Sequence, residues 1–62
     1  MRVTLYCEEM IGEEEMSVND VQPYINLIKT NGYMDGEGYE YTFQSAQVEP
    51  EGVCIYLTEK ES

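Results

Sequence analysis

The sequence predicts a small α+β domain in which a three-stranded sheet carries one helix on one face. The main observation is the uncharged run Gly52–Thr58, which is the longest stretch of strand-forming residues. Its apolar groups on both faces are typical of a strand in the middle of a sheet. Two further strand patterns, in residues 2–8 and 39–48, flank a stretch with apolar residues at helical spacing.

The first expected strand covers residues 2–8. Its residues alternate between one side, with Val3, Leu5 and Cys7, and the other side, with Thr4 and Tyr6. This period of two is typical of a strand with one buried face. Two consecutive glutamates end the pattern, and residues 9–19 are expected to form an acidic turn.

The helix is expected to cover residues 20–31. Ser17, Asn19 and Asp20 are candidate caps, and Pro23 favours Asp20, because proline is tolerated only in the first turn of a helix. The apolar face of this helix contains Val21, Tyr24, Ile25 and Ile28. Asn31 and Gly32 supply a left-handed stop.

Residues 39–48 and 53–59 are expected to form a hairpin. Pro50 followed by Gly52 fits a three-residue loop with a bulge at the glycine, which would place Glu49 opposite Val53. In this register Phe43 shares a face with the apolar residues of strand 53–59 and points towards the helix. Residues 60–62 are expected to form a polar tail.

The element order β-α-β-β predicts a sheet with the strand order 1-3-2 and the third strand antiparallel to both others. This is a split β-α-β unit, or half of a ferredoxin-like sandwich. The face opposite the helix would then be uncovered and almost uncharged, with Thr4, Tyr6, Thr42, Gln44, Ala46, Val48, Cys54, Tyr56 and Thr58. Cys7 and Cys54 point to opposite faces in this register, so we expect two free thiols.

The composition limits the classes of function. The chain has 62 residues, 13 acidic and three basic side chains and a net charge of −10. Such a surface repels nucleic acids and anionic membranes, so direct binding to either is not expected. No apolar run approaches the roughly 20 residues of a membrane span, and no signal-peptide pattern opens the sequence. The expected location is the cytoplasm, where thiols stay reduced.

Enzyme chemistry is not expected. The chain has no histidine, so the commonest general base is missing and no Ser–His or Cys–His pair exists. A chain of this length also has difficulty enclosing a deep pocket. Two cysteines without histidine do not complete a zinc site, and the loop around Asp35 and Glu37 lacks the spacing of an EF-hand. We therefore expect no cofactor and no metal.

The remaining feature is a concentration of acidic residues at the end of the first strand and the start of the helix. Six carboxylates fall within thirteen positions: Glu8, Glu9, Glu13, Glu14, Glu15 and Asp20. A solvated acidic face would explain some of them, but natural surfaces usually mix the two signs of charge. The sharper hypothesis is phosphate mimicry, in which these residues occupy the basic site of a DNA- or RNA-binding protein and inhibit it.

In composition alone, the chain resembles the small acidic inhibitors that phages and mobile elements direct against host nucleases, glycosylases, polymerases and CRISPR effectors. No motif carries this resemblance, so it assigns no family. The alternative hypothesis is a homodimeric assembly module whose acidity serves solubility. Its copies would pair through the edge of the first strand or through the face formed by Thr4, Tyr6, Cys54 and Tyr56.

Overall fold

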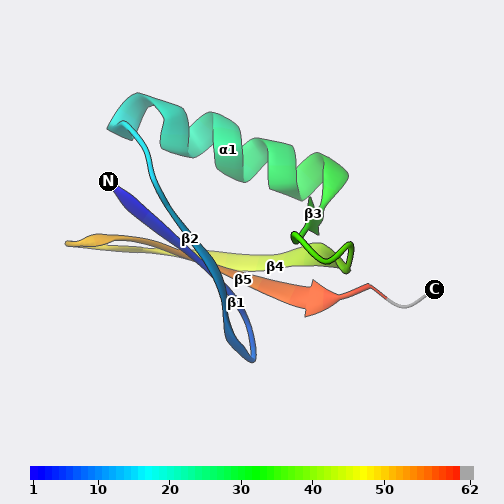
Figure 1. Ribbon diagram of the computed structural model, residues 1–62. Coiled ribbons are helices and arrows are strands. Elements are labelled where there is room, and N and C mark those ends of the chain that lie inside the picture. Colours follow the sequence, from blue (N-terminus) through cyan, green and yellow to red (C-terminus); the bar gives the residue numbers. More distant parts are fainter. Residues whose placement is uncertain (61–62) are drawn as a thin grey trace.

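Strand β5, Gly52–Glu59, lies in the middle of the sheet, as its uncharged sequence predicts. The computed structural model describes residues 1–60 and is a small α+β fold with one helix and a mixed, curled sheet (Figure 1). The other elements are β1 (Arg2–Cys7), β2 (Glu9–Glu15), α1 (Val18–Asn31), β3 (Tyr33–Met34) and β4 (Glu40–Glu49). The strand order is β2-β1-β5-β4-β3, and α1 covers one face.

The predicted order of the three main strands is correct, because β5 separates β1 from β4. The predicted direction of the first strand is wrong, since β1 runs parallel to β5. The cause is β2: residues 9–15 form a strand antiparallel to β1, not an acidic turn. The chain therefore returns to the end of the sheet where β1 begins before it enters α1. The predicted half ferredoxin-like sheet of three strands is wrong in this respect, since the sheet has five strands.

The helix begins two residues earlier than predicted. Ser17 is the cap, in an extended conformation, and its carbonyl oxygen accepts the N–H of Asp20 at 2.9 Å. Pro23 therefore lies inside α1, where it is exposed and removes one backbone hydrogen bond, to the carbonyl of the exposed residue Asn19. The predicted stop is confirmed: Gly32 has a φ of 77°, and its N–H donates to the Ile28 carbonyl at 2.8 Å.

The hairpin reaches the predicted orientation of Phe43 by a different register. Glu49 pairs with Gly52 across a two-residue turn, so the predicted bulge at Gly52 is wrong. A bulge at Gln44 shifts the register instead and places Phe43 opposite Leu57, where it packs against the core beneath the helix. One consequence is a correction: Ala46 and Val48 lie on the helix side of the sheet, opposite Ile55 and Val53, and not on the uncovered face.

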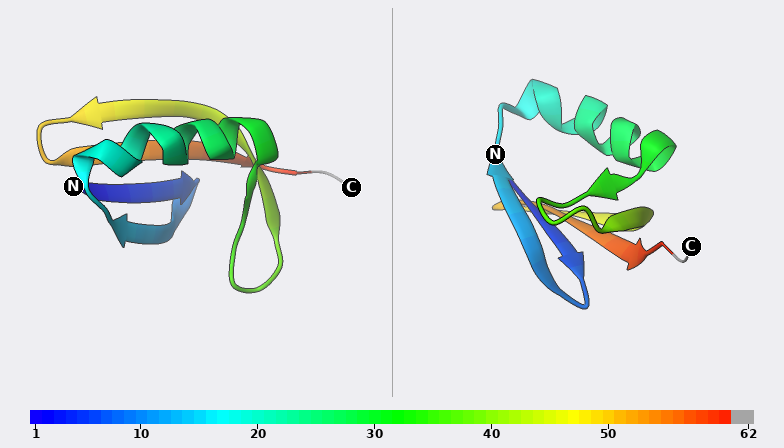
Figure 2. Two further views of the ribbon diagram at one scale, coloured as in Figure 1. Left: turned by 90° about the horizontal axis from the view of Figure 1, so that it is seen from above. Right: turned by 45° about the vertical axis from the view of Figure 1, so that its right-hand side comes forward.

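The core joins the three central elements. Its buried side chains come from β1, α1 and β5: Val3, Leu5, Val21, Ile25, Ile28, Val53, Ile55 and Leu57. The sheet curls around this core, so that the Tyr33 hydroxyl on β3 approaches Gly12 on β2 although these strands lie at opposite ends of the sheet. Figure 2 shows α1 crossing above the strands, with the β1–β2 hairpin and the loop between β3 and β4 extending on the same side.

Candidate functional site

The six predicted partner-binding carboxylates do not form one cluster. Glu8 and Glu9 lie at the tip of the β1–β2 hairpin, whereas Glu13, Glu14 and Glu15 lie at the other end of β2. Residues 9 and 15 are separated by six strand positions, or roughly 20 Å at 3.3 Å per residue. Asp20 lies in the first turn of α1. The hairpin therefore divides residues that are close in the sequence between two ends of the molecule.

Two of these six carboxylates form ion pairs. Glu13 lies 3.3 Å from the Arg2 guanidinium, and Glu15 lies 3.4 Å from the N-terminal amine. Lys60 pairs with Glu40 at 3.5 Å, and the Lys29 ammonium lies 5.3 Å from the centre of the Phe43 ring. Within residues 1–60 these contacts leave nine of twelve carboxylates without a cationic partner. These nine unpaired carboxylates leave the surface strongly negative.

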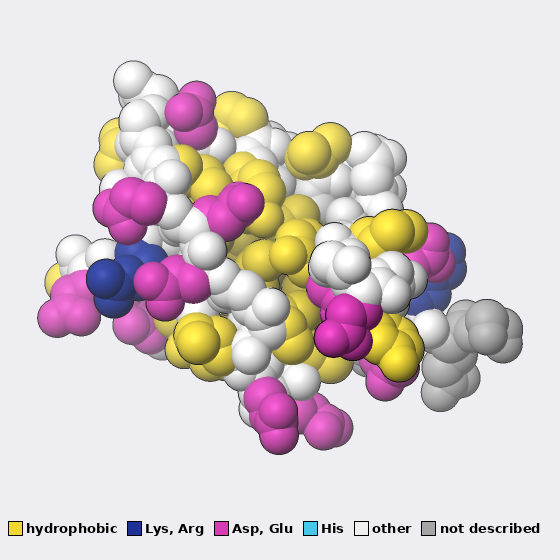
Figure 3. Space-filling view, in the orientation of Figure 1, with side chains coloured by type: hydrophobic (Ala, Val, Ile, Leu, Met, Phe, Trp, Pro, Cys, Tyr) yellow, Lys and Arg dark blue, Asp and Glu magenta, His cyan; other side chains and the backbone are white. Residues whose placement is uncertain are grey.

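An apolar surface lies between the acidic margins. Figure 3 shows hydrophobic side chains between the helix and the sheet, with acidic side chains to the left, below and to the right of them. Half-buried hydrophobic residues pack on the core here, among them Ile11 and Met16 from β2 and its continuation, Tyr24 from α1 and Tyr33 from β3. Burial and the nearby Glu14 carboxylate raise the pKa of Tyr24 to about 12, so its hydroxyl stays protonated.

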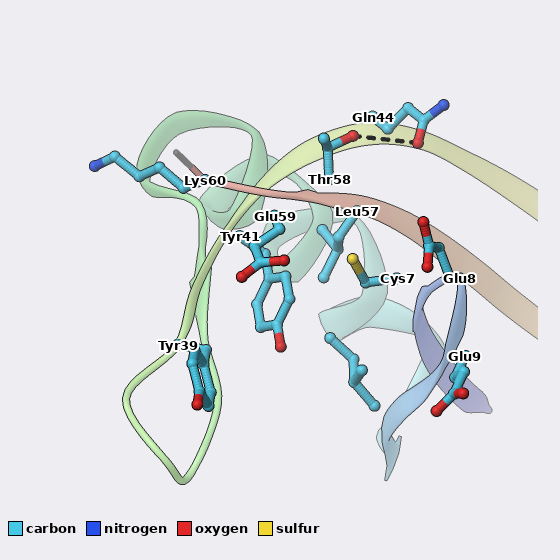
Figure 4. Close-up of a pocket in the computed structure, with 11 residues that line it drawn as sticks. Cys7, Glu8, Glu9, Tyr39, Tyr41, Gln44, Leu57, Thr58, Glu59 and Lys60 are labelled. Atoms are coloured by element: carbon cyan, nitrogen blue, oxygen red, sulfur yellow. Dashed lines mark hydrogen bonds between the residues drawn. The ribbon is translucent and has the colours of Figure 1, made fainter. Parts of the chain in front are cut away.

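A second feature is an open hollow beside the hairpin tip. Its volume is about 1260 Å³, and its lining includes Cys7, Glu8, Glu9, Tyr39, Tyr41 and Glu59. Figure 4 shows Glu8 and Glu9 across the hollow from Tyr39 and Tyr41, with the Cys7 thiol between them. The two glutamates at this site were predicted from the sequence, but the two tyrosines and Glu59 were not, because only the curl of the sheet brings the start of β4 and the end of β5 towards the hairpin tip.

Asp35 holds the tyrosine wall of the hollow in place. One of its carboxylate oxygens accepts the N–H groups of Glu37 at 2.9 Å and Tyr39 at 3.0 Å, and the other accepts the Tyr41 hydroxyl at 3.1 Å. Burial raises the pKa of Asp35, but these donors outweigh it and hold the pKa below its usual value. Burial, together with the bond to Asp35, raises the pKa of Tyr41 to about 12. Asp35 therefore uses its oxygens to order the loop.

Replacing Asp35 with Ala is expected to loosen residues 35–39. The amide protons of Glu37 and Tyr39 lose their acceptor, so their hydrogen exchange, measured by NMR, should accelerate about tenfold or more. Because the folded-state pKa of Asp35 is lowered, its stabilising effect is present above the unfolded pKa and is lost as the pH falls through the folded value. Glu37→Ala in the same loop is the control, and equal acceleration in both variants would contradict this role.

Comparison with protein-family models, curated proteins and solved structures finds no match. Within residues 1–60, no cluster of three or more acidic or cysteine side chains is arranged to hold a metal ion. In the same residues, no helix is long and apolar enough to cross a membrane.

The face opposite the helix brings together the four residues predicted for a partner or dimer contact. Thr4 aligns with Cys54 and Tyr6 with Tyr56, and the two tyrosine rings stack with centroids 5.6 Å apart. Thr4 is 8% exposed, and the other three are half-buried. Burial and the nearby Glu49 carboxylate raise the pKa of the Cys54 thiol. The neutral tyrosine pair is present as predicted, but β2 covers the edge of β1, so that edge is not available for dimerisation.

The tip of the hairpin has a strained backbone. Glu8 has a φ of 66°, in the left-handed region that glycine adopts without cost and that other residues adopt rarely. A non-glycine residue loses roughly 1–2 kcal/mol in this conformation. Glu8 therefore carries a charged side chain at a position where the backbone alone would favour glycine. Strain of this kind concentrates at functional sites.

Proposed function

We propose that this protein is a non-catalytic acidic binding protein that occupies the basic site of a DNA- or RNA-binding protein and inhibits it. In this role its carboxylates take the place of nucleic-acid phosphates. The observation that carries the proposal is the strained position of Glu8 at the tip of a hairpin, beside Glu9 and the tyrosine-lined hollow. We centre the proposed contact on this tip and not on the whole acidic run, because the six carboxylates lie at two ends of β2.

Charge supplies the long-range part of the recognition. Nine carboxylates in residues 1–60 have no cationic partner, and they surround the molecule on several sides. A field of this sign attracts a basic groove and raises the rate of encounter. It does not select one partner, because screening by salt weakens it and any basic surface responds to it.

The hollow supplies the short-range part. A lysine or arginine side chain of the partner that enters it meets the carboxylates of Glu8, Glu9 and Glu59. The rings of Tyr39 and Tyr41 lie in the same lining and offer cation–π contacts, which are worth roughly 0.5–2 kcal/mol each. Asp35 holds Tyr41 in position before binding, which reduces the entropy lost on association.

The proposal is tested by capture followed by competition. The immobilised protein is exposed to cell lysate at low salt, and bound proteins are eluted with a salt gradient. Each eluted protein is then purified and loaded with labelled duplex DNA or RNA, and this protein is added as the competitor. We expect this protein to displace the labelled nucleic acid, and its affinity to fall steeply with salt. Captured proteins that keep their nucleic acid while bound to this chain would contradict the proposal.

Two triple variants locate the contact. Glu8→Gln/Glu9→Gln/Glu59→Gln removes the charges around the hollow, and Glu13→Gln/Glu14→Gln/Glu15→Gln removes three charges from the other end of β2. Both lower the net negative charge by three, so long-range attraction changes equally. We expect the first variant to lose about tenfold or more in affinity and the second to lose much less. Equal losses would mean that net charge alone determines binding.

A further inference from the structure

The two edges of the sheet differ in charge. The edge strand β2 carries Glu9, Glu13, Glu14 and Glu15, and charged side chains are a common protection against unwanted strand pairing. At the other side, β3 pairs only with Glu40 and Tyr41. Among residues 1–60, no strand pairs with the outer edge of residues 42–49, and residues 42–48 contain no charge. One edge is therefore protected and the other is open.

The bulge at Gln44 limits the open edge to its second half. Bulges twist a strand and interrupt its ladder of hydrogen bonds, so residues 45–49 form the regular part. Ala46 and Val48 of this part are exposed on the helix side of the sheet, and Val48 is 75% exposed. Single exposed apolar residues are ordinary, but here they line an unpaired strand.

The helix adds a third apolar residue above this edge. Lys29 lies over Phe43, and Val18 shares that side of α1, because eleven residues make about three full turns. From Lys29 to Val18 is about 16 Å along the helix, and from Phe43 to Val48 is a similar distance of about 16 Å along the strand. Figure 2 shows the start of α1 and the end of β4 at the same end of the molecule. Val18, which is 63% exposed, therefore lies above the same end of β4 as Val48.

We propose that the β4 edge pairs with the same edge of a second copy of this chain, antiparallel and centred on Gln47. In this register Ala46 faces the partner's Val48, and Ser45 faces the partner's Glu49. A two-fold axis through Gln47 joins the two sheets into one continuous sheet. The proposal is independent of the proposed function, since the hollow uses Tyr41 and Gln44 from the first half of β4 and the proposed pairing uses residues 45–49.

The lack of charge on this edge favours an identical neutral strand over a basic one. Residues 42–48 offer no carboxylate to a basic peptide, whereas the antiparallel register suits an identical neutral strand. It also places each Glu49 opposite a serine and keeps the two Glu49 side chains at opposite ends of the contact. A parallel pairing would bring like charges face to face, which is destabilising.

Sedimentation equilibrium tests the pairing. Two chains of charge −10 repel each other, so the dimer should tighten when NaCl is raised from about 50 mM to about 500 mM. This is the opposite of the salt dependence expected for binding to a basic partner. A chain that remains a monomer at high salt and high concentration, or that pairs only with an added basic peptide, would overturn the proposal.

Val48→Glu places a charge opposite the partner's Ala46 and should raise the dimer dissociation constant about tenfold or more. Leu27→Glu is the matched control, because Leu27 is also an exposed apolar residue, at 56%, but lies on the other side of α1. The control should change the constant less than about threefold. A dimer equally stable in both variants would overturn the proposal. In a mixed labelled sample, an intermolecular NOE between the methyl groups of Ala46 and Val48 would establish the register.

Discussion

Replacing Ile55 with Ala is expected to lower the free energy of unfolding by about 2–5 kcal/mol. Ile55 is 0% exposed and lies in the central strand, opposite Leu5 on β1 and Ala46 on β4. The loss combines the transfer of a large apolar side chain out of the core with the cavity that it leaves. A chain of this size has a total stability of roughly 3–9 kcal/mol, so the variant should lose a large share of it.

Urea unfolding followed by circular dichroism measures this loss. Ile11→Ala is the matched control, because it removes the same atoms from a half-buried position on the edge strand β2. The control should cost only about 1 kcal/mol, since less apolar area leaves water at that position. Equal losses in the two variants would mean that β5 is not the centre of the core.

The central strand was predictable because its signal is local. Residues 52–58 have no charge and alternate between two apolar faces, and only the middle of a sheet buries both faces of a strand. The buried face of the helix was predictable for the same reason, since Val21, Ile25 and Ile28 recur at helical spacing and are all buried. The predicted core therefore agrees with the structure where one periodic segment packs on another.

Strand β2 was not predictable from its own residues. It contains a glycine and four glutamates, which are poor strand formers. Its conformation depends on pairing with β1 and on ion pairs from Arg2 and the N-terminal amine, which are remote in the sequence. Missing this strand reversed the predicted direction of β1 and placed Glu8 and Glu9 beside Glu13–Glu15.

The hollow was not predictable because its lining residues come from separate parts of the chain. Glu8 and Glu9 come from one hairpin, Tyr39 from the residue before β4, Tyr41 from the start of β4, and Glu59 from the end of β5. The curl of the sheet brings these ends together, and curl follows from twist and bulges in several strands at once. The acidic character of the proposed contact follows from composition, whereas its location and its tyrosines depend on the arrangement of the strands.

Replacing Gly52 with Ala is expected to destabilise the fold by about 1–3 kcal/mol, because it inserts atoms into a packed region. The sequence favoured glycine here for a left-handed turn, but the turn has only two residues and Gly52 pairs with Glu49. The structure gives a different reason. Gly52 also pairs with Arg2 on β1, and an added Cβ would overlap the Arg2 carbonyl oxygen. Backbone atoms cannot rotate away as a flexible side chain can.

The expected damage is local to the parallel pairing of β1 and β5. Amide hydrogen exchange should therefore accelerate first at Val3 and Val53, which follow Arg2 and Gly52 in the register. Gly36→Ala is the control, since among residues 1–60 no atom outside its own neighbours lies within 4 Å of the added Cβ. That variant should stay within about 0.5 kcal/mol of the parent in urea unfolding. If both variants unfold at the same urea concentration, the close approach of β1 to Gly52 does not determine the residue at this position.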